Sequence, residues 1–379
     1  MNMNRSLQVL SLVFFFGVLS FFASRSTFDQ FAALSSYQWN FSPPQYTIYQ
    51  PSVLEDFVMN RLDELGFNNT PSAICKMWQN DTAYADIATE IHLFEQQLGE
   101  YATASHLFQR TSSKSILKDI TKTYQDGQGS LSWDDASKQV CETVRINSPF
   151  SNASTLLSHS SRAGFIEPLL TAMRHPGWCK GGNWILDLTY LVHDFHTMCR
   201  NLKPTSRIIL VDMGASLDFH GTDEPPVYLI SKFRQFGFFL DHIYAFEITP
   251  KDPNEVYQRV PNDWVPAYHW MNIPVQANKT SYLNPFQMIL NEFEEDDLVL
   301  VKLDVDTPEL ELNLVYQLLS QENDEGKRLS RLIDHFYFEH HVTAWEMSTS
   351  WVPANGTVKE SLILFETLRK NGIASHYWV

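Results

Sequence analysis

Two carboxylates stand directly after the most apolar strand-like segment of the chain. Residues 298–303 are almost wholly apolar and rich in β-branched side chains, which predicts a strand buried on both faces of a parallel sheet. Asp304 and Asp306 follow that strand, and residues 309–319 then show the apolar spacing of a helix. Open α/β sheets bind ligands at the carboxyl edge of their strands. Carboxylates at this edge are therefore candidates for proton transfer, and we rank Asp304 first as base or positioning group.

Two earlier predicted strands end in residues that suit a nucleoside. Residues 207–212 end in Asp212 and lead into a glycine turn, where the backbone can bend tightly and approach a ligand. Residues 242–247 end in Glu247, whose carboxylate is placed to accept hydrogen bonds from both hydroxyls of a ribose. Together these features favour a nucleoside site over an ordinary strand-to-helix turn. The turn residues are Gly214, Ala215 and Ser216.

The carboxyl-terminal half alternates strands with helices, which is typical of a doubly wound, mostly parallel α/β sheet. Before it, residues 56–202 predict a mainly helical region because apolar side chains recur there at helical spacing. The predicted strands are residues 207–212, 242–247, 268–273, 298–303, 333–338 and 375–379. The predicted helices are residues 56–65, 82–108, 113–123, 184–202, 227–236, 253–260, 285–293, 309–319 and 359–371.

The amino terminus carries a targeting signal. An uninterrupted apolar run covers residues 7–23, with Arg5 before it and Arg25 after it. It predicts an uncleaved signal anchor within residues 1–26, and a cleaved signal peptide is the alternative. Residues 27–55 then form a predicted stem. Sequons for N-glycosylation are more frequent than chance predicts and indicate a lumenal body; they begin at Asn40, Asn68, Asn80, Asn152, Asn278 and Asn355.

The apolar run and the sequons predict a single-pass type II protein of the Golgi or endoplasmic reticulum membrane, or a secreted protein.

The four cysteines lack the spacing of a zinc site. They predict one or two disulfides of open pairing, with buried free thiols as the alternative. A formal net charge of −16 argues against a nucleic-acid partner, since phosphate contacts need clustered Lys and Arg. The cysteines are Cys75, Cys141, Cys179 and Cys199.

The order of these motifs resembles the FkbM-type methyltransferases, a branch of the Rossmann-like methyltransferases that use S-adenosylmethionine. The segments concerned are VDMGAS, YAFEITP, LVLVKLDVDTPELE and IDHFYFEHH, and the match is most specific at residues 301–306. The resemblance implies a Rossmann-like methyltransferase domain over residues 203–379, with S-adenosylmethionine as cofactor. It implies that Asp212, Gly214 and Ala215, with Ser216 next to them, line the methionine end of the cofactor and Glu247 its ribose. Lys302, Asp304 and Glu339 would form the active-site edge.

Methyl transfer makes few chemical demands. The protein aligns a nucleophile with the sulfonium, keeps water out and helps to remove the proton of a hydroxyl. Candidates for that base, besides Asp304, are Asp306, His340 and His341. The predicted acceptor is a hydroxyl of a glycan or small metabolite, and no metal is assigned to this reaction.

Two alternatives stay open at the level of sequence. Asp304-Val305-Asp306 after an apolar strand also resembles the metal and nucleotide-sugar site of lumenal GT-A glycosyltransferases, with His341 as a possible further ligand. A catalytically inactive methyltransferase-like binding protein is the other, because Asp218 stands where the methyltransferase turn usually has a second glycine.

Overall fold

The structure is a computed structural model of the 379-residue chain, in which residues 43–379 form one compact unit. It describes residues 47–64, 85–110, 115–127, 129–147, 149–150, 155–158, 188, 191–217, 225–340 and 357–378. None of the helices in these ranges is both long and apolar enough to cross a membrane. The apolar run 7–23, Cys75, Cys179, Asp218, His341 and every sequon except that of Asn278 lie outside the described residues.

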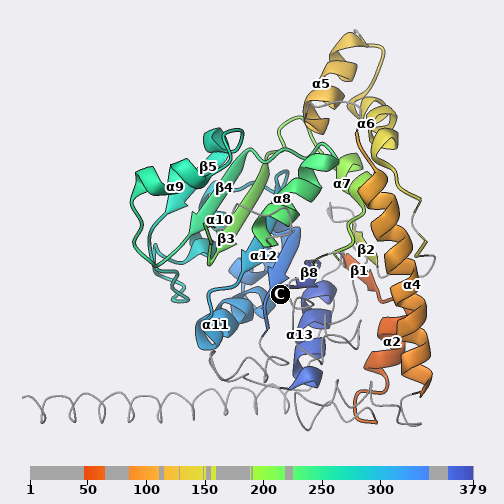
Figure 1. The fold of residues 1–379 in the computed structure, drawn as a ribbon, viewed down its shortest axis with the longest axis vertical. Coiled ribbons are helices and arrows are strands. Elements are labelled where there is room, and N and C mark those ends of the chain that lie inside the picture. Colours follow the sequence, from red (N-terminus) through yellow and green to blue (C-terminus); the bar gives the residue numbers. More distant parts are fainter. Residues whose placement is uncertain are drawn as a thin grey trace, which may run out of the picture. The chain divides into compact units, whose positions relative to one another are not determined.

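The core of the fold is a six-stranded sheet in the order β5-β4-β3-β6-β7-β8 (Figure 1). All five strand pairs are parallel, and helices flank the sheet. This confirms the predicted α/β class with a parallel sheet. The order reverses between β3 and β6, where open α/β sheets have their ligand crevice. The strands are β3 (Ile208–Met213), β4 (His242–Phe246), β5 (Tyr268–Met271), β6 (Leu298–Leu303), β7 (His335–Phe338) and β8 (Ala374–Tyr377).

Strands β3 and β6 are central, and every residue in both is buried. Their register pairs Leu210 with Leu300 and Asp212 with Lys302. Successive side chains of a strand point to opposite faces, so these four lie on one face of the sheet. That face packs against the helices α7 and α8 through a shared apolar core. The other face is covered by α13, whose Phe365 ring lies 5.9 Å from that of Phe338 in β7.

The helices of this half begin where the sequence predicts them, except α12. Its nine residues bury only Gly326, Leu329 and Leu332, and a short helix with so few apolar side chains has too weak a periodic pattern to be recognised. The helices are α8 (Pro225–Gln235), α9 (Pro253–Arg259), α10 (Pro285–Glu292), α11 (Pro308–Leu319), α12 (Asp324–Leu332) and α13 (Val358–Lys370), with a 3-10 turn η6 at Val265–Ala267.

The described part of the amino-terminal region is mostly helical, and it also contains a small antiparallel sheet of β1 and β2. Its first elements, β1 and the start of α2, fall in the range assigned to the stem. The described elements are β1 (Thr47–Gln50), α2 (Val53–Met59), α4 (Ala85–Leu107), α5 (Ile116–Asp126), α6 (Trp133–Cys141), the 3-10 turn η2 (Glu142–Val144), β2 (Thr155–Ser158) and α7 (Phe195–Arg200).

The prediction of a helix over residues 184–202 is wrong for most of the residues in this range that the structure describes. Only α7 (Phe195–Arg200) is helical, because the side chain of Asp194 accepts a hydrogen bond from the Thr197 amide and caps the helix there. Residues 191–194 therefore run as a non-helical segment toward the sheet. This brings His193 into the core, where it is 2% exposed.

A disulfide cross-links the amino-terminal region internally, and a buried ion pair joins this region to the sheet domain. A disulfide connects Cys141 of α6 with Cys199 of α7, which agrees with the prediction of at least one disulfide and supplies the pairing that the sequence left open. Arg369 of α13 forms an ion pair with Glu55 of α2 at 3.0 Å, and their side chains are 1% and 3% exposed. Because breaking such a buried pair leaves an uncompensated charge, these contacts fix α2 against the sheet domain.

Glu95 of α4 provides a first testable prediction. Its Oε1 is buried with no hydrogen-bond partner among the described residues, and burial raises its pKa to about 7. The folded state thus holds this proton more tightly than the unfolded state, so the contribution to stability is full below pH 4.5 and is lost as the pH rises to about 7. We expect Glu95→Gln to stabilise the protein by ~1 kcal/mol at pH 8, a figure reduced for partial exposure.

Urea unfolding at pH 8 and at pH 4.5 measures this difference, which should vanish at the lower pH. The matched control is Glu100→Gln on the exposed surface of the same helix, with an expected change within ~0.5 kcal/mol at both pH values. Equal stability of Glu95→Gln and wild type at pH 8 would contradict the prediction.

Candidate ligand site at the carboxyl edge of the sheet

Lys302 is a buried cation at the point where the strand order reverses. Its Nζ lies 3.1 Å from Asp212 Oδ1 and 3.1 Å from Asp304 Oδ2, and donates to the carbonyl oxygen of Gly214 at 3.0 Å. The side chains of Lys302 and Asp212 are 5% and 7% exposed. Burial alone would lower the pKa of Lys302, but the two carboxylates raise it above its ordinary value. The ammonium group therefore stays charged, and with both carboxylates ionised the three side chains carry one net negative charge.

Gly214 makes the close approach of β3 and β6 possible. Its φ is +83°, in the left-handed region that favours glycine. A Cβ at this position would collide with the carbonyl oxygen of Asp304. On the other side, the amides of Gly214 and Ala215 donate to the carbonyl oxygen of Phe246 at 3.0 and 2.9 Å. The turn is thus held between the ends of β4 and β6.

Three carboxylates lie close together just beyond the carboxyl ends of β6 and β7. Asp304, Asp306 and Glu339 each offer an oxygen atom within 4.8 Å of the other two. Asp306 is exposed and has a φ of 54°, a left-handed conformation that residues with a side chain adopt at a cost. Buried Glu311 accepts a hydrogen bond from the Val305 amide at 2.8 Å and holds this turn in place. Such oxygens can share a proton or hold a divalent cation.

Glu247 lies at the same edge, directly after β4. Its Oε1 accepts a hydrogen bond from the Thr249 amide at 2.6 Å. The side chain of Asn272, which follows β5, donates to the carbonyl oxygens of Glu247 and Thr249 at 2.7 and 2.9 Å. The loop after β4 is therefore fixed against the loop after β5. Since the Gly214 amide donates to the carbonyl oxygen of Phe246, the residue just before Glu247, Glu247 begins beside the glycine turn.

The other residues predicted for the site lie at the glycine turn, against α13 or outside the described residues. Ala215 is buried and Ser216 is exposed just beyond the glycine turn. The Nδ1 atom of His340 lies 2.9 Å from the Ser361 hydroxyl of α13, and its ring stacks on Phe338. His340 is therefore engaged with α13. His341, the other histidine proposed as a base, is outside the described residues.

Trp378 belongs to this site and was not predicted from the sequence. Its indole Nε1 donates to Asp304 Oδ2 at 3.2 Å, and its ring centroid lies 5.8 Å from Lys302 Nζ. The indole thus shields the ammonium group by a cation–π contact and holds the carboxylate. A signal was present in the sequence: the last predicted strand, residues 375–379, had to end at the same edge as the strand before Asp304.

The fold and this edge together define a parallel α/β protein with a cluster of buried and exposed polar side chains at its switch point. Comparisons of the chain with known protein families, with curated proteins and with solved structures find no match.

Proposed function

We propose that the protein is an S-adenosylmethionine-dependent methyltransferase that acts on a hydroxyl of a glycan or small metabolite. One observation carries the proposal: the glycine turn at Gly214 lies between Glu247 on one side and the Lys302 and Asp304 pair on the other. A nucleoside with a charged tail is bound by an acidic side chain at its ribose, by closely approaching backbone at its tail and by a polar group at its reacting end. The three groups just named supply these contacts in that order along the carboxyl edge of the sheet.

Charge supports the same cofactor. Asp212, Lys302 and Asp304 sum to one negative charge when both carboxylates are ionised, and this group is largely buried. A positively charged sulfonium is attracted to such a site, and the attraction is stronger where water is excluded. The ammonium of Lys302 keeps the two carboxylates from repelling each other in the absence of the cofactor.

The residues at the edge divide the chemical tasks between them. Asp304 Oδ2 is held by Lys302 and Trp378, which suits a group that orients the acceptor hydroxyl. Glu339 lies next to it at the end of β7 and is placed to take the proton as the methyl group is transferred. The expected reaction is an in-line displacement in which the acceptor oxygen bonds to the methyl carbon, the sulfur keeps the electron pair of the broken bond, and the proton goes to a carboxylate.

Calorimetric titration of the purified chain with S-adenosylmethionine tests the proposal. We expect micromolar binding by the wild type and a loss of affinity of about 100-fold in Glu247→Ala, because charge-assisted bonds to the ribose are lost. Glu255→Ala is the matched control, since Glu255 is an exposed acid of α9 that pairs with Arg259 of the same helix. Binding that is equally strong in Glu247→Ala would refute the assignment of the ribose site.

A second candidate function is metal-dependent glycosyl transfer. It is favoured by the mutual proximity of Asp304, Asp306 and Glu339, which are hard oxygen ligands of the kind that Mn²⁺ and Mg²⁺ prefer. Binding of a nucleotide sugar that requires added Mn²⁺, without binding of S-adenosylmethionine, would select this function. Failure to bind either ligand would select an inactive binding protein.

We further propose that the protein works in the lumen of the secretory pathway, in the Golgi or endoplasmic reticulum membrane, with secretion as the alternative. The Cys141–Cys199 disulfide supports an oxidising compartment. Asn278 supports it as well, since this sequon asparagine is exposed in a loop. A mobility shift of the cellular protein on treatment with an N-glycosidase tests the location, and an unchanged mobility would contradict it.

A further inference from the structure

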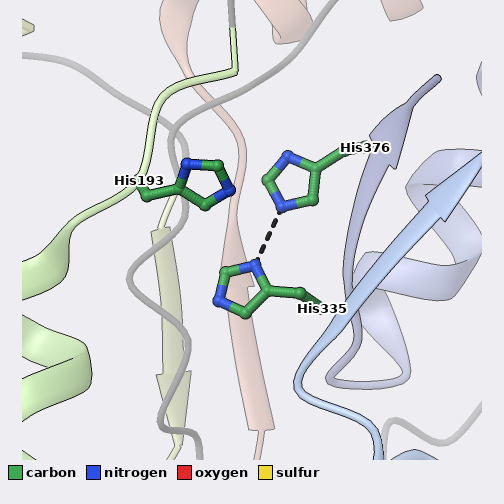
Figure 2. A group of neighbouring side chains, drawn as sticks. All are labelled: His193, His335 and His376. Atoms are coloured by element: carbon green, nitrogen blue, oxygen red, sulfur yellow. Dashed lines mark hydrogen bonds between the residues drawn. The ribbon is translucent and has the colours of Figure 1, made fainter. Parts of the chain in front are cut away.

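Three histidines from distant parts of the chain meet inside the protein. His193 precedes α7, His335 begins β7 and His376 lies in β8; they are 2%, 0% and 0% exposed. Figure 2 shows the three rings turned toward a common point. One nitrogen of each ring lies within 4.8 Å of the others, and His335 Nδ1 is 2.9 Å from His376 Nε2. The Tyr337 hydroxyl lies beside them, 2.7 Å from His193 Nε2.

The register of the strands explains this convergence. Leu300 of β6 pairs with His335, which pairs with Ala374 of β8, while Tyr337 pairs with His376. Because side chains two residues apart share a face, both strand histidines and Tyr337 lie on the face covered by α7 and α8. His193 reaches the same place from above the sheet, because residues 191–194 are not helical.

Short contacts bring the ring nitrogens together inside the protein. His335 Nδ1 lies 2.9 Å from His376 Nε2, and His193 Nε2 lies 2.7 Å from the Tyr337 hydroxyl. Neutral imidazole nitrogen is a common ligand of transition metals. The outer nitrogens, His193 Nδ1 and His335 Nε2, are buried without a hydrogen-bond partner among the described residues. When the inner nitrogens coordinate a metal ion, these outer nitrogens carry the ring protons, because a neutral imidazole has one N–H and one free electron pair.

We propose that His193, His335 and His376 form a structural binding site for a divalent transition metal, most suitably Zn²⁺, with the Tyr337 oxygen as the nearest fourth donor. Zn–N bonds of 2.0–2.1 Å in a tetrahedron place neighbouring nitrogens about 3.4 Å apart. The separations of 2.9 Å for one pair and up to 4.8 Å overall bracket this value, so small rotations of the rings suffice. Imidazole ligands suit zinc and its neighbours rather than Mg²⁺ or Ca²⁺.

The proposed metal site is enclosed by protein, which indicates a structural role and not a catalytic one. A catalytic zinc keeps one position open to water, whereas a structural zinc is fully enclosed by protein ligands. Here the ligands come from β7, β8 and the segment before α7, so the metal would pin the amino-terminal region to the sheet. A pocket of about 140 Å³ adjoins the cluster, and its lining includes His193, Asp194 and the half-exposed Arg145.

The site also connects with the carboxyl edge. The ring of Tyr337 lies 5.8 Å from that of Trp378, and Trp378 donates to Asp304. A metal that orders Tyr337 would thereby help to hold the indole against Lys302. Its role in the proposed reaction would be one of positioning only, because none of its ligands reaches the edge.

Cobalt titration of the full chain, purified in detergent and stripped with a strong chelator, tests the site. We expect one equivalent of Co²⁺ to give the visible absorption of a tetrahedral complex without a thiolate band, and one equivalent of Zn²⁺ to displace it. His335→Gln should abolish the spectrum, while Tyr337→Phe should shift it and keep the stoichiometry. The matched control is His269→Gln, which removes an imidazole from the partly buried pair of His242 and His269, 3.0 Å apart, and should leave the spectrum unchanged.

The wild type also provides a test that does not depend on folding of the variants. Saturating Zn²⁺ should raise the Tm of the stripped protein by at least ~5 °C. Three results would overturn the proposal: an unchanged Tm with no cobalt spectrum, a spectrum that persists in His335→Gln, or a spectrum lost equally in His269→Gln. In the first case the three histidines are a hydrogen-bonded part of the core.

Discussion

Replacing Lys302 with methionine is expected to destabilise the protein by about 3–5 kcal/mol at pH 7, more than any other single change at the carboxyl edge except that of the glycine turn. The ammonium lies 3.1 Å from a carboxylate oxygen of both Asp212 and Asp304. Without it two acidic groups face each other in a site where Asp212 is 5% exposed. An unpaired buried charge cannot be relieved by water, and the apolar methionine gives it no hydrogen bond.

Urea unfolding at pH 7 measures this loss, with Arg331→Met as the matched control. Arg331 pairs with Glu295 at 2.7 Å, but their side chains are 47% and 53% exposed. Water screens this pair, so its loss should cost less than ~1 kcal/mol. If the buried charge is the cause, adding Asp212→Asn to Lys302→Met should restore part of the stability. Similar losses in the two methionine variants would contradict this account of the edge.

The sheet could be predicted from sequence because four of its six strands, β3, β6, β7 and β8, are buried at every residue. Residues 298–303 were expected to form a strand and do so as β6. Short-range patterns also located the ends of α8 to α11, where proline or a capping side chain marks the first turn. Such signals lie within a few residues of each other, so a single sequence carries them in full.

Features that depend on distant partners were not predicted. Strand β1 pairs with β2, about a hundred residues later in the chain, and neither segment has a strong pattern of its own. The helix expected over residues 184–202 had regular apolar spacing, but tertiary contacts draw His193 into the core instead. Tertiary packing overrides local helix propensity in this way when the apolar side chains have a better partner.

In the candidate site too, local features could be predicted from the sequence, whereas contacts between distant residues could not. Each strand end was assigned from local sequence, and the structure brings Asp212, Gly214, Glu247 and Asp304 to one edge. Which of these residues lie next to one another depends on the strand order and register, and neither could be predicted from the sequence. Trp378 beside Lys302 is therefore a finding of the structure. The three-histidine cluster is another, since its members are far apart in the chain.

Gly214→Ala is expected to cost at least ~4 kcal/mol, which is exceptional for the addition of one methyl group. Two effects combine. A φ of +83° disfavours alanine by about 1–2 kcal/mol, and the new Cβ collides with the carbonyl oxygen of Asp304. Relief requires the ends of β3 and β6 to move apart, which lengthens the hydrogen bond from the Asp304 amide to the Met213 carbonyl oxygen.

Gly129→Ala separates the two effects. Gly129 has a nearly equal φ of +82°, but a Cβ there meets no atom within 4 Å. It should therefore lose only the conformational part, about 1–2 kcal/mol. Unfolding free energies of both variants isolate the collision as their difference, and equal losses would show that the approach of β3 to β6 is not tight. If the difference is large and Gly214→Ala still folds in mild conditions, its affinity for S-adenosylmethionine should fall as well, because the same displacement moves Asp304 and Lys302 away from the glycine turn.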